Sequence, residues 1–226
     1  MTGQDTDLAT MVTGLDCAAI VDAMGRAHHH RAHVLSLVSP TPQRSMFGPA
    51  VTIAYLPYRD DFTDTKTAGF AGWFYRAVGN TPEGAVLVLS SGGYPDVSHG
   101  GGTKMSRLHN HELAGLLCDG RLRDFDELAR YRFATWCRGE ATRAGGDTVM
   151  PCAANIPVEV GGVCITPGDY IYADRAGAVV IPAHSVRDVL TEAQHIQAED
   201  EDFLAQIRNE DPSALRAGRR FGRQEL

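Results

Sequence analysis

Two short segments carry residue types that could bind and polarise a small anion. In residues 118–124, CDGRLRD, Arg123 and Asp124 stand side by side just past a short apolar run. A guanidinium beside a carboxylate predicts a site for an oxyanion and a metal ion. Upstream, the glycine run of residues 99–104, HGGGTK, leads into an expected helix, and its backbone N–H groups could hold a carboxylate or a developing enolate. Together the two segments outline an anion-handling active site.

Two side chains of the glycine run offer further chemistry. His99 is a candidate for acid/base work, because the ordinary pKa of histidine lies near neutrality. Lys104 could bind a substrate carboxylate, form a Schiff base with a keto acid if it is desolvated, or simply be solvated. The run could also be only a flexible connector, since a short glycine run alone is a weak signal.

Other motifs also have a purely structural interpretation. Asp124 with Glu127 three residues later could cap a helix, a device that needs no metal. Arg123 could form a surface ion pair. The histidines of residues 28–30 and 109–111 lack the further ligands of a tetrahedral zinc site, so we interpret them as loop or surface residues.

Length, composition and charge are those of an ordinary globular protein. The 226 residues fit one medium domain, with 43% hydrophobic and 22% charged residues. No apolar run reaches the roughly 20 residues of a membrane span, and no secretory segment is seen, so we expect a cytoplasmic location. The net charge of −7 gives no support to nucleic-acid binding. The five cysteines are widely spaced, which argues against a disulfide framework or a zinc site.

Apolar runs and helical patterns alternate through the middle of the chain, and hairpins follow. We predict strands at residues 34–38, 50–56, 85–90, 113–118, 133–137, 156–160, 163–165, 170–173 and 178–181. We predict helices at residues 67–78, 103–110 and 124–131. The alternation indicates an α/β fold.

Longer helical patterns flank this region. Residues 7–25 follow helical spacing, and Gly14 could split that helix. A second apolar stripe runs through residues 185–210, where Ser185 and Asp188 resemble a capping pair. We therefore predict a single domain over residues 1–210 and a basic, solvated tail over residues 211–226.

Several landmarks occur in a fixed order along residues 45–182. They are FGPAVT at 47–52, GAVLV at 84–88, the glycine run, DGRLRD at 119–124, NIPV at 155–158, GGV at 161–163, PGD at 167–169 and AD at 173–174. In order and spacing they resemble the RraA-like family, which includes 4-hydroxy-4-methyl-2-oxoglutarate/4-carboxy-4-hydroxy-2-oxoadipate aldolases and the regulator of ribonuclease E. The resemblance implies a β/β/α sandwich of the swivelling-domain type, assembled as a homotrimer or a hexamer with active sites between subunits.

The resemblance also implies roles for individual residues. In aldolase members the pair matching Arg123 and Asp124 is catalytic: Asp124 would hold Mg2+ or Mn2+, and Arg123 would contact the keto oxygen of the substrate. Backbone amides of the loop would bind the carboxylate of a pyruvate-like group, the matching residues being Gly100, Gly101, Gly102, Thr103 and Lys104. Such a site would stabilise the pyruvate enolate that forms when a carbon–carbon bond next to a 2-keto acid breaks.

Two departures from the family pattern bear on the substrate. Aldolase members usually carry an acidic residue where this chain has Gly102. The acid/base group of those enzymes therefore has no counterpart at this position. The helix before the strand at 85–90 often holds an Asn and a His, where this chain has WFYR at residues 73–76. The substrate is therefore expected to differ.

The sequence favours a metal-dependent lyase that acts on a small 2-keto acid by retro-aldol cleavage or oxaloacetate-type decarboxylation. Two alternatives stay open: a Schiff-base lyase that uses Lys104, and a non-enzymatic RraA-like regulator. The regulators lose the carboxylate matching Asp124, and because this chain keeps it, catalysis is favoured. Neither a nucleic-acid nor a membrane partner is expected.

Overall fold

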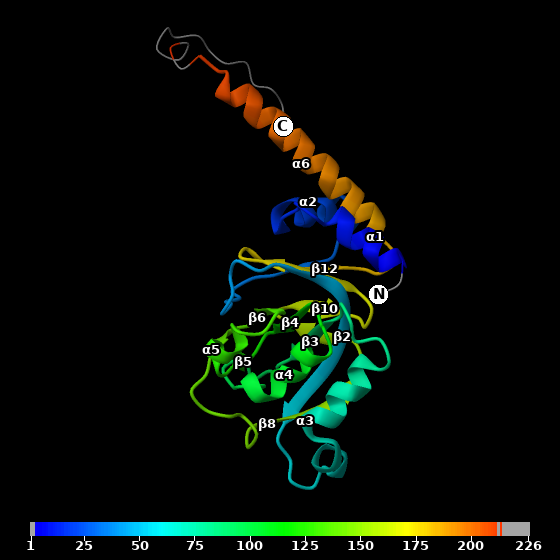
Figure 1. Cartoon of the computed structure of the whole chain (residues 1–226), viewed down its shortest axis with the longest axis vertical. Coiled ribbons are helices and arrows are strands. Elements are labelled where there is room, and N and C mark those ends of the chain that lie inside the picture. Colours follow the sequence, from blue (N-terminus) through cyan, green and yellow to red (C-terminus); the bar gives the residue numbers. More distant parts are fainter. Residues whose placement is uncertain (1–2, 212, 214–226) are drawn as a thin grey trace.

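One eight-stranded sheet organises the chain in the computed structural model, which describes residues 3–211 and 213 (Figure 1). Its strands run in the order β1, β12, β11, β2, β3, β4, β6, and β8 also pairs with β2. The strands are β1 His33–Val34, β2 Met46–Pro57, β3 Val86–Ser90, β4 Gly115–Cys118, β6 Ala134–Trp136, β8 Val149–Ala154, β11 Tyr170–Asp174 and β12 Gly177–Ile181. Two smaller pairs lie outside it: β5 Arg121–Leu122 with β7 Gly139–Glu140, and β9 Val158–Val160 with β10 Val163–Ile165.

The long strand β2 joins an antiparallel half of this sheet to a parallel half. Its first residues pair antiparallel with β11, its middle pairs in parallel with β3, and its end pairs antiparallel with β8. Strands β4 and β6 continue the parallel order from β3. The parallel half delivers the ends of β3 and β4 to one edge, where loops and helix N-termini meet.

Alternating side chains build a separate apolar core on each face of the strands. In β3, Leu87 and Leu89 pack with α3 Thr63–Val78 and α4 Gly102–Asn110, whereas Val86 and Val88 pack with β9, β10, β11 and β12. The reverse faces of β11 and β12 pack with α1 Gly3–Met11, α2 Cys17–Ala27 and α6 Val186–Arg208. The two groups of helices lie on opposite sides of the strands (Figure 1).

This period-two alternation between two buried faces is the β/β/α layering that was predicted. The fold class, a mixed α/β sandwich with flanking helices, is therefore confirmed. Of the described helices, none is both long and apolar enough to cross a bilayer.

The first and last helices differ from the predicted ones in their breaks and caps. The helix predicted at residues 7–25 is split at Gly14, the alternative that the sequence allowed, and an uninterrupted helix is wrong. Gly14 has a φ of 87°, and Asp16 caps a new helix by accepting from the Ala19 N–H at 2.9 Å. Helix α6 matches the one predicted at residues 185–210 closely. Its expected capping pair is wrong, because the Ser185 side chain contacts His28 Nε2 at 2.9 Å instead.

Other differences are local. The helix predicted at residues 124–131 is only α5, Phe125–Leu128. Strand β8 was missed because Pro151 interrupts its pattern; the strand pairs only with β2, and its register shifts beside this proline, as expected for a proline tolerated in a sheet. Of the predicted basic tail at 211–226, all but residues 211 and 213 lies outside the described residues.

Asp119, just after β4, fixes the segment that leads to the glycine run. Its carboxylate accepts from the Ser91 N–H at 2.6 Å, the Ser91 hydroxyl at 3.1 Å and the Gly161 N–H at 3.5 Å. Burial raises the pKa of Asp119, and these donors act in the opposite direction by favouring the carboxylate. One side chain thus links the ends of β3 and β4 to the β9–β10 turn.

Replacing Asp119 by Ala should lower the free energy of unfolding by about 2 kcal/mol, because a buried N–H loses its acceptor. Urea denaturation measures the change. Asp126→Ala, at an exposed position on α5, is the matched control and should stay within about 0.5 kcal/mol of wild type. Equal effects of the two substitutions would contradict the linking role of Asp119.

Candidate active site

The two predicted segments run side by side in the structure. The His99 N–H donates to the Arg121 carbonyl at 2.9 Å, and the Arg123 N–H donates to the Gly100 carbonyl at 2.9 Å. Ser98 and Arg121 form a parallel bridge at the start of this contact. The backbone therefore places the glycine run against the residues that precede α5.

Asp124 presents its carboxylate to the glycine run. Its backbone is left-handed, with φ 63° and ψ 50°, and its Oδ2 accepts from the Gly102 N–H at 3.0 Å. The side chain makes no capping bond to α5, and Glu140 Oε1 accepts from the Phe125 N–H instead. The helix-capping interpretation of Asp124 and Glu127 is therefore wrong. A non-glycine residue in this conformation costs roughly 1 kcal/mol or more, which is typical of functional positions.

Close packing explains the glycines of the run. A Cβ on Gly101 would lie 2.5 Å from Asp124 Oδ2, and one on Gly102 would lie 2.6 Å from Glu127 Cγ. Larger residues would push Asp124 or Glu127 away. The acidic residue expected in aldolase members at the Gly102 position therefore has no room here unless Glu127 moves.

A cavity of about 240 Å³ opens between the two segments. Most of the predicted site residues line it, together with a loop that the sequence did not point to. Its lining consists of Ser98, Gly100, Gly101, Thr103, Lys104, Arg123, Asp124, Ala144 and Gly145. Gly102 is outside the lining and meets the site through its N–H group. Arg123 and Asp124, the expected anion and metal residues, thus share one cavity.

His99 is buried beneath the loop. Its Nδ1 lies 2.8 Å from the Val97 carbonyl and its Nε2 lies 3.2 Å from the Ser91 carbonyl, while the Tyr55 hydroxyl donates to the His99 carbonyl at 2.9 Å. Burial lowers the pKa of His99. With both ring nitrogens against backbone carbonyls, the geometry favours a role in holding the glycine run over the predicted acid/base role.

Lys104 reaches the cavity from the first turn of α4. Desolvation, followed by repulsion from Arg123 and Arg107, lowers the pKa of its ammonium group. The residue as a whole keeps exposed surface, which limits the shift, because water screens a partly exposed charge. Lys104 and Arg123 give the cavity two cationic side chains.

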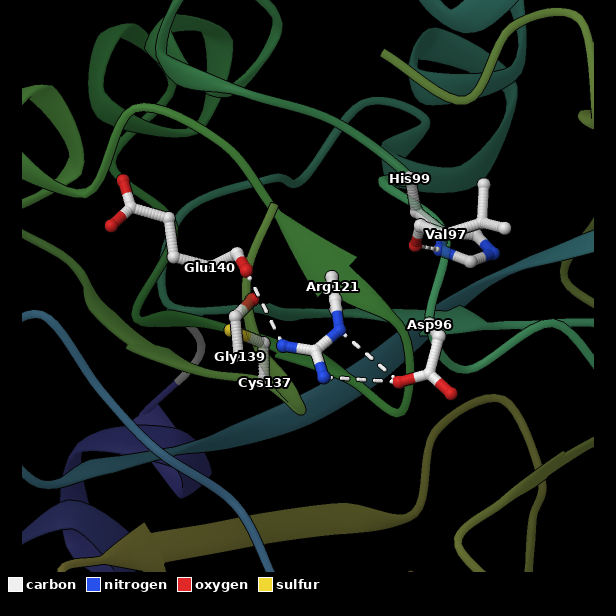
Figure 2. Close-up of polar contacts among 7 residues, drawn as sticks. All are labelled: Asp96, Val97, His99, Arg121, Cys137, Gly139 and Glu140. Carbon is white, nitrogen blue, oxygen red and sulfur yellow. Dashed lines mark hydrogen bonds and ion pairs between the residues drawn. The ribbon is translucent and has the colours of Figure 1, made fainter. Parts of the chain in front are cut away.

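A neighbouring arginine forms the ion pair that was considered for Arg123. The Arg121 guanidinium contacts Asp96 Oδ1 at 3.0 and 3.1 Å and donates to the Glu140 carbonyl at 3.3 Å (Figure 2). Among the described residues Arg123 has no such carboxylate partner. Arg121 therefore links the loop at Asp96 to β7. Arg123 lines the cavity, where its guanidinium can contact an anion.

The donor set at Asp124 suits only some metal ions. No group of three or more His, Cys, Asp or Glu side chains that could hold a metal occurs within residues 3–211 and 213. A single exposed carboxylate fits a hard ion such as Mg2+, which keeps several waters and takes one or two carboxylates. It does not fit structural zinc, which needs four protein ligands.

Loop residues 142–148 supply the part of the site that sequence reasoning missed. Gly145 packs on Ser98 so closely that a Cβ would meet the Ser98 carbonyl and the Val97 side chain. The loop is held by the Arg143–Asp147 ion pair and by the Thr148 N–H, which donates to the Gly145 carbonyl at 2.9 Å. The Gly145–Gly146 pair in the sequence could have indicated that this loop packs closely on another segment, since glycine often marks a close backbone approach.

Gly101→Ala should displace the Asp124 carboxylate and weaken binding of Mn2+ by at least about tenfold, because the new methyl would lie 2.5 Å from Oδ2, closer than atomic contact allows. Calorimetric titration with Mn2+ measures the affinity. Gly25→Ala, on α2 where a Cβ meets nothing within 4 Å, is the control. Unchanged Mn2+ affinity in a folded Gly101→Ala protein would argue against this metal position.

Two known proteins are similar to this chain in sequence. Protein DlpA of Legionella pneumophila is 26% identical over 174 residues, which cover 77% of this chain and 27% of that protein. A protein of Halalkalibacterium halodurans, named as a candidate 4-hydroxy-4-methyl-2-oxoglutarate aldolase, is 32% identical over 126 residues, covering 56% of this chain and 60% of that protein. The chain thus spans less than two thirds of the length of either relative.

Solved structures show the same fold. An uncharacterised protein from Pseudomonas syringae pv. tomato has a TM-score of 0.75 at 21% identity, covering 91% of this chain and 94% of its own. Streptomyces coelicolor RraAS2, described as an unusual member of the RNase ES inhibitor RraA family, has a TM-score of 0.74 at 23% identity, covering 89% and 98%. The family model described as RraA-like, Aldolase/RraA, matches residues 17–180. The chain therefore belongs to the RraA-like family.

Proposed function

We propose that this protein is a carbon–carbon lyase that acts on a small 2-keto acid through a pyruvate-type enolate, with Mg2+ or Mn2+ as cofactor. The observation that supports this most is the shared cavity of Arg123, Asp124 and the glycine run. Positive and hydrogen-bonding groups converge there, as the negative charge of an enolate requires. The names of relatives as candidate aldolases support the same reaction class.

Each group of the site has a part in this proposal. The first N–H groups of α4 have no partner inside the helix; that of Gly102 donates to Asp124, which leaves those of Thr103 and Lys104 as candidates to bind the substrate carboxylate. Arg123 would donate to the keto oxygen as it becomes an enolate oxygen. Asp124 would hold the ion, which when bound supplies further positive charge to that oxygen.

Two reactions fit this machinery. Retro-aldol cleavage and oxaloacetate decarboxylation both leave the pyruvate enolate, but retro-aldol cleavage also needs a base for the substrate hydroxyl. Gly102 supplies no acid or base, whereas decarboxylation needs only stabilisation of the enolate. We therefore propose decarboxylation as the reaction that the site supports with the fewest groups, and homotrimeric or hexameric assembly in the cytoplasm as its setting.

Pyruvate release from oxaloacetate in the presence of Mn2+ tests the proposal. Arg123→Ala should lower kcat by about 10²-fold or more, since a donor to the developing oxyanion is lost. Asp124→Asn, which keeps an oxygen for the Gly102 N–H but loses the charge, should raise the Mn2+ concentration required. Arg132→Ala, at an exposed position outside the cavity, is the control. Activity above the background rate that survives both EDTA and Arg123→Ala would refute the proposal.

The lowered pKa of Lys104 favours one further candidate function, a metal-independent Schiff-base lyase. Its amine would attack the keto carbon, and water would leave as the imine forms. Borohydride reduction in the presence of pyruvate should then add a stable group to Lys104, as detected by peptide mass spectrometry. We expect no adduct in the wild type and none in Lys104→Met; an adduct confined to wild-type Lys104 would replace the metal mechanism.

A purely regulatory role, as the name of the Streptomyces neighbour suggests for that protein, is the remaining alternative. Asp124 argues for catalysis because the resemblance implies its loss in the regulators. Failure to bind Mn2+, together with tight association with a protein partner, would favour regulation instead.

A further inference from the structure

A second cavity adjoins the candidate active site. It has a volume of about 210 Å³ and shares Ser98, Lys104 and Gly145 with the first cavity. We call it the apolar chamber, lined by Tyr55, Tyr58, Arg59, Phe62, Gly69, Phe70, Ser98, His99, Lys104, Gly145, Gly146, Val149, Met150 and Pro151. These three residues border both spaces, so the two cavities lie next to each other.

Aromatic and aliphatic side chains dominate the chamber wall. Phe62 and Phe70 come from the α3 side, Tyr58 from the end of β2, and Met150 with Pro151 from β8. Phe70 is buried, and Phe62 is 38% exposed. Such a wall binds a flat apolar group better than a charged one.

Two polar side chains at the wall already have hydrogen-bond partners. The Tyr55 hydroxyl donates to the His99 carbonyl at 2.9 Å. The Arg59 guanidinium donates to both carboxylate oxygens of Asp61, at 2.9 and 2.6 Å. The chamber therefore presents no uncompensated arginine to a second substrate carboxylate.

Lys104 stands at the boundary between the two spaces. Its Nζ lies 5.6 Å from the centroid of the Phe70 ring, so the ammonium group faces an aromatic ring of the chamber wall. Arg123 lines only the first cavity, whereas Phe62 and Phe70 line only the chamber.

We propose, building on the proposed lyase function, that the apolar chamber binds the C4 substituent of a 4-hydroxy-2-keto acid, and that this substituent is an aryl group or a branched alkyl group. A cavity of about 150 Å³ already accepts benzene, so a phenyl ring fits in this one. The charged end of the substrate lies at Arg123, and the apolar end lies against Phe62 and Phe70.

The cleavage balances without an oxidant or reductant. Because Gly102 supplies no base, water takes the C4 hydroxyl proton, the C3–C4 bond breaks, and its electron pair forms the C2–C3 enolate of pyruvate. C4 leaves as the aryl or alkyl aldehyde, and a proton returns to C3. Because C4 departs from the enolate, its substituent needs a separate space, which the chamber provides.

Binding of unreactive analogues tests the chamber without relying on turnover. Calorimetry with Mg2+ should find 2-oxo-4-phenylbutanoate bound at least about tenfold more tightly than 2-oxobutanoate, because the phenyl group is removed from water. Phe62→Arg should abolish this advantage, leave 2-oxobutanoate binding unchanged and strengthen 2-oxoglutarate binding. Phe203→Arg, at a 56% exposed position on α6, is the matched control.

Equal affinity for the phenyl and plain compounds, or a phenyl advantage that survives Phe62→Arg, would overturn the inference. Kinetic measurements then separate the chamber assignment from the lyase proposal. They compare kcat/KM for 4-hydroxy-2-oxo-4-phenylbutanoate with kcat/KM for 4-hydroxy-2-oxoglutarate. Turnover of oxaloacetate without any aryl preference would refute the chamber assignment alone. A phenyl advantage in binding with no turnover of any compound would refute the lyase and keep the chamber as an aryl keto-acid site.

Discussion

The hydrogen bond from the Gly102 N–H to the Asp124 carboxylate is the contact on which the site depends. It joins the start of α4 to the residue before α5, two elements that are separate in the chain. The backbone contacts of His99 with Arg121 and of Arg123 with Gly100 bring these segments within reach. The left-handed backbone at Asp124 then turns its carboxylate toward the glycine run instead of toward its own helix.

Packing around this contact explains why the run is glycine-rich. The loop approaches Asp124 and Glu127 too closely for a Cβ at Gly101 or Gly102. An acidic side chain at position 102 and the observed position of Glu127 therefore exclude each other. The packing of α5 against the loop therefore accounts for glycine at position 102.

Sequence reasoning reached the fold because its signals are local. Short apolar runs predicted β3, β11 and β12, whose alternate residues fill two buried faces in the structure, and the apolar stripe predicted α6. The helical spacing of residues 7–25 is interrupted in the structure, because Gly14 has a left-handed backbone and Asp16 caps a new helix. Pro151 concealed β8 because its pairing with β2 depends on tertiary context.

The site was predicted only in part, for a related reason. Arg123, Asp124 and the glycine run form continuous motifs, and motifs can be read from a sequence. The contribution of Gly145 and the two carbonyls around His99 depends on contacts between distant segments, which no spacing encodes. The sequence around Asp124 matches a helix-capping pattern, but it does not reveal the left-handed backbone that turns the carboxylate toward Gly102.

Strand β2 has an implication for how such proteins diversify. It is hydrogen-bonded to β11, β3 and β8 in succession, so a slip of one residue would invert its side chains in all three pairings at once. An insertion inside it would therefore disturb all three pairings unless a bulge absorbed it, as the register shift at Ala54/Tyr55 does opposite β8. The connections at residues 58–62 and 142–148 lie outside β2. Residues of both connections line cavities, so changes there would alter the cavities and leave the strand pairing intact.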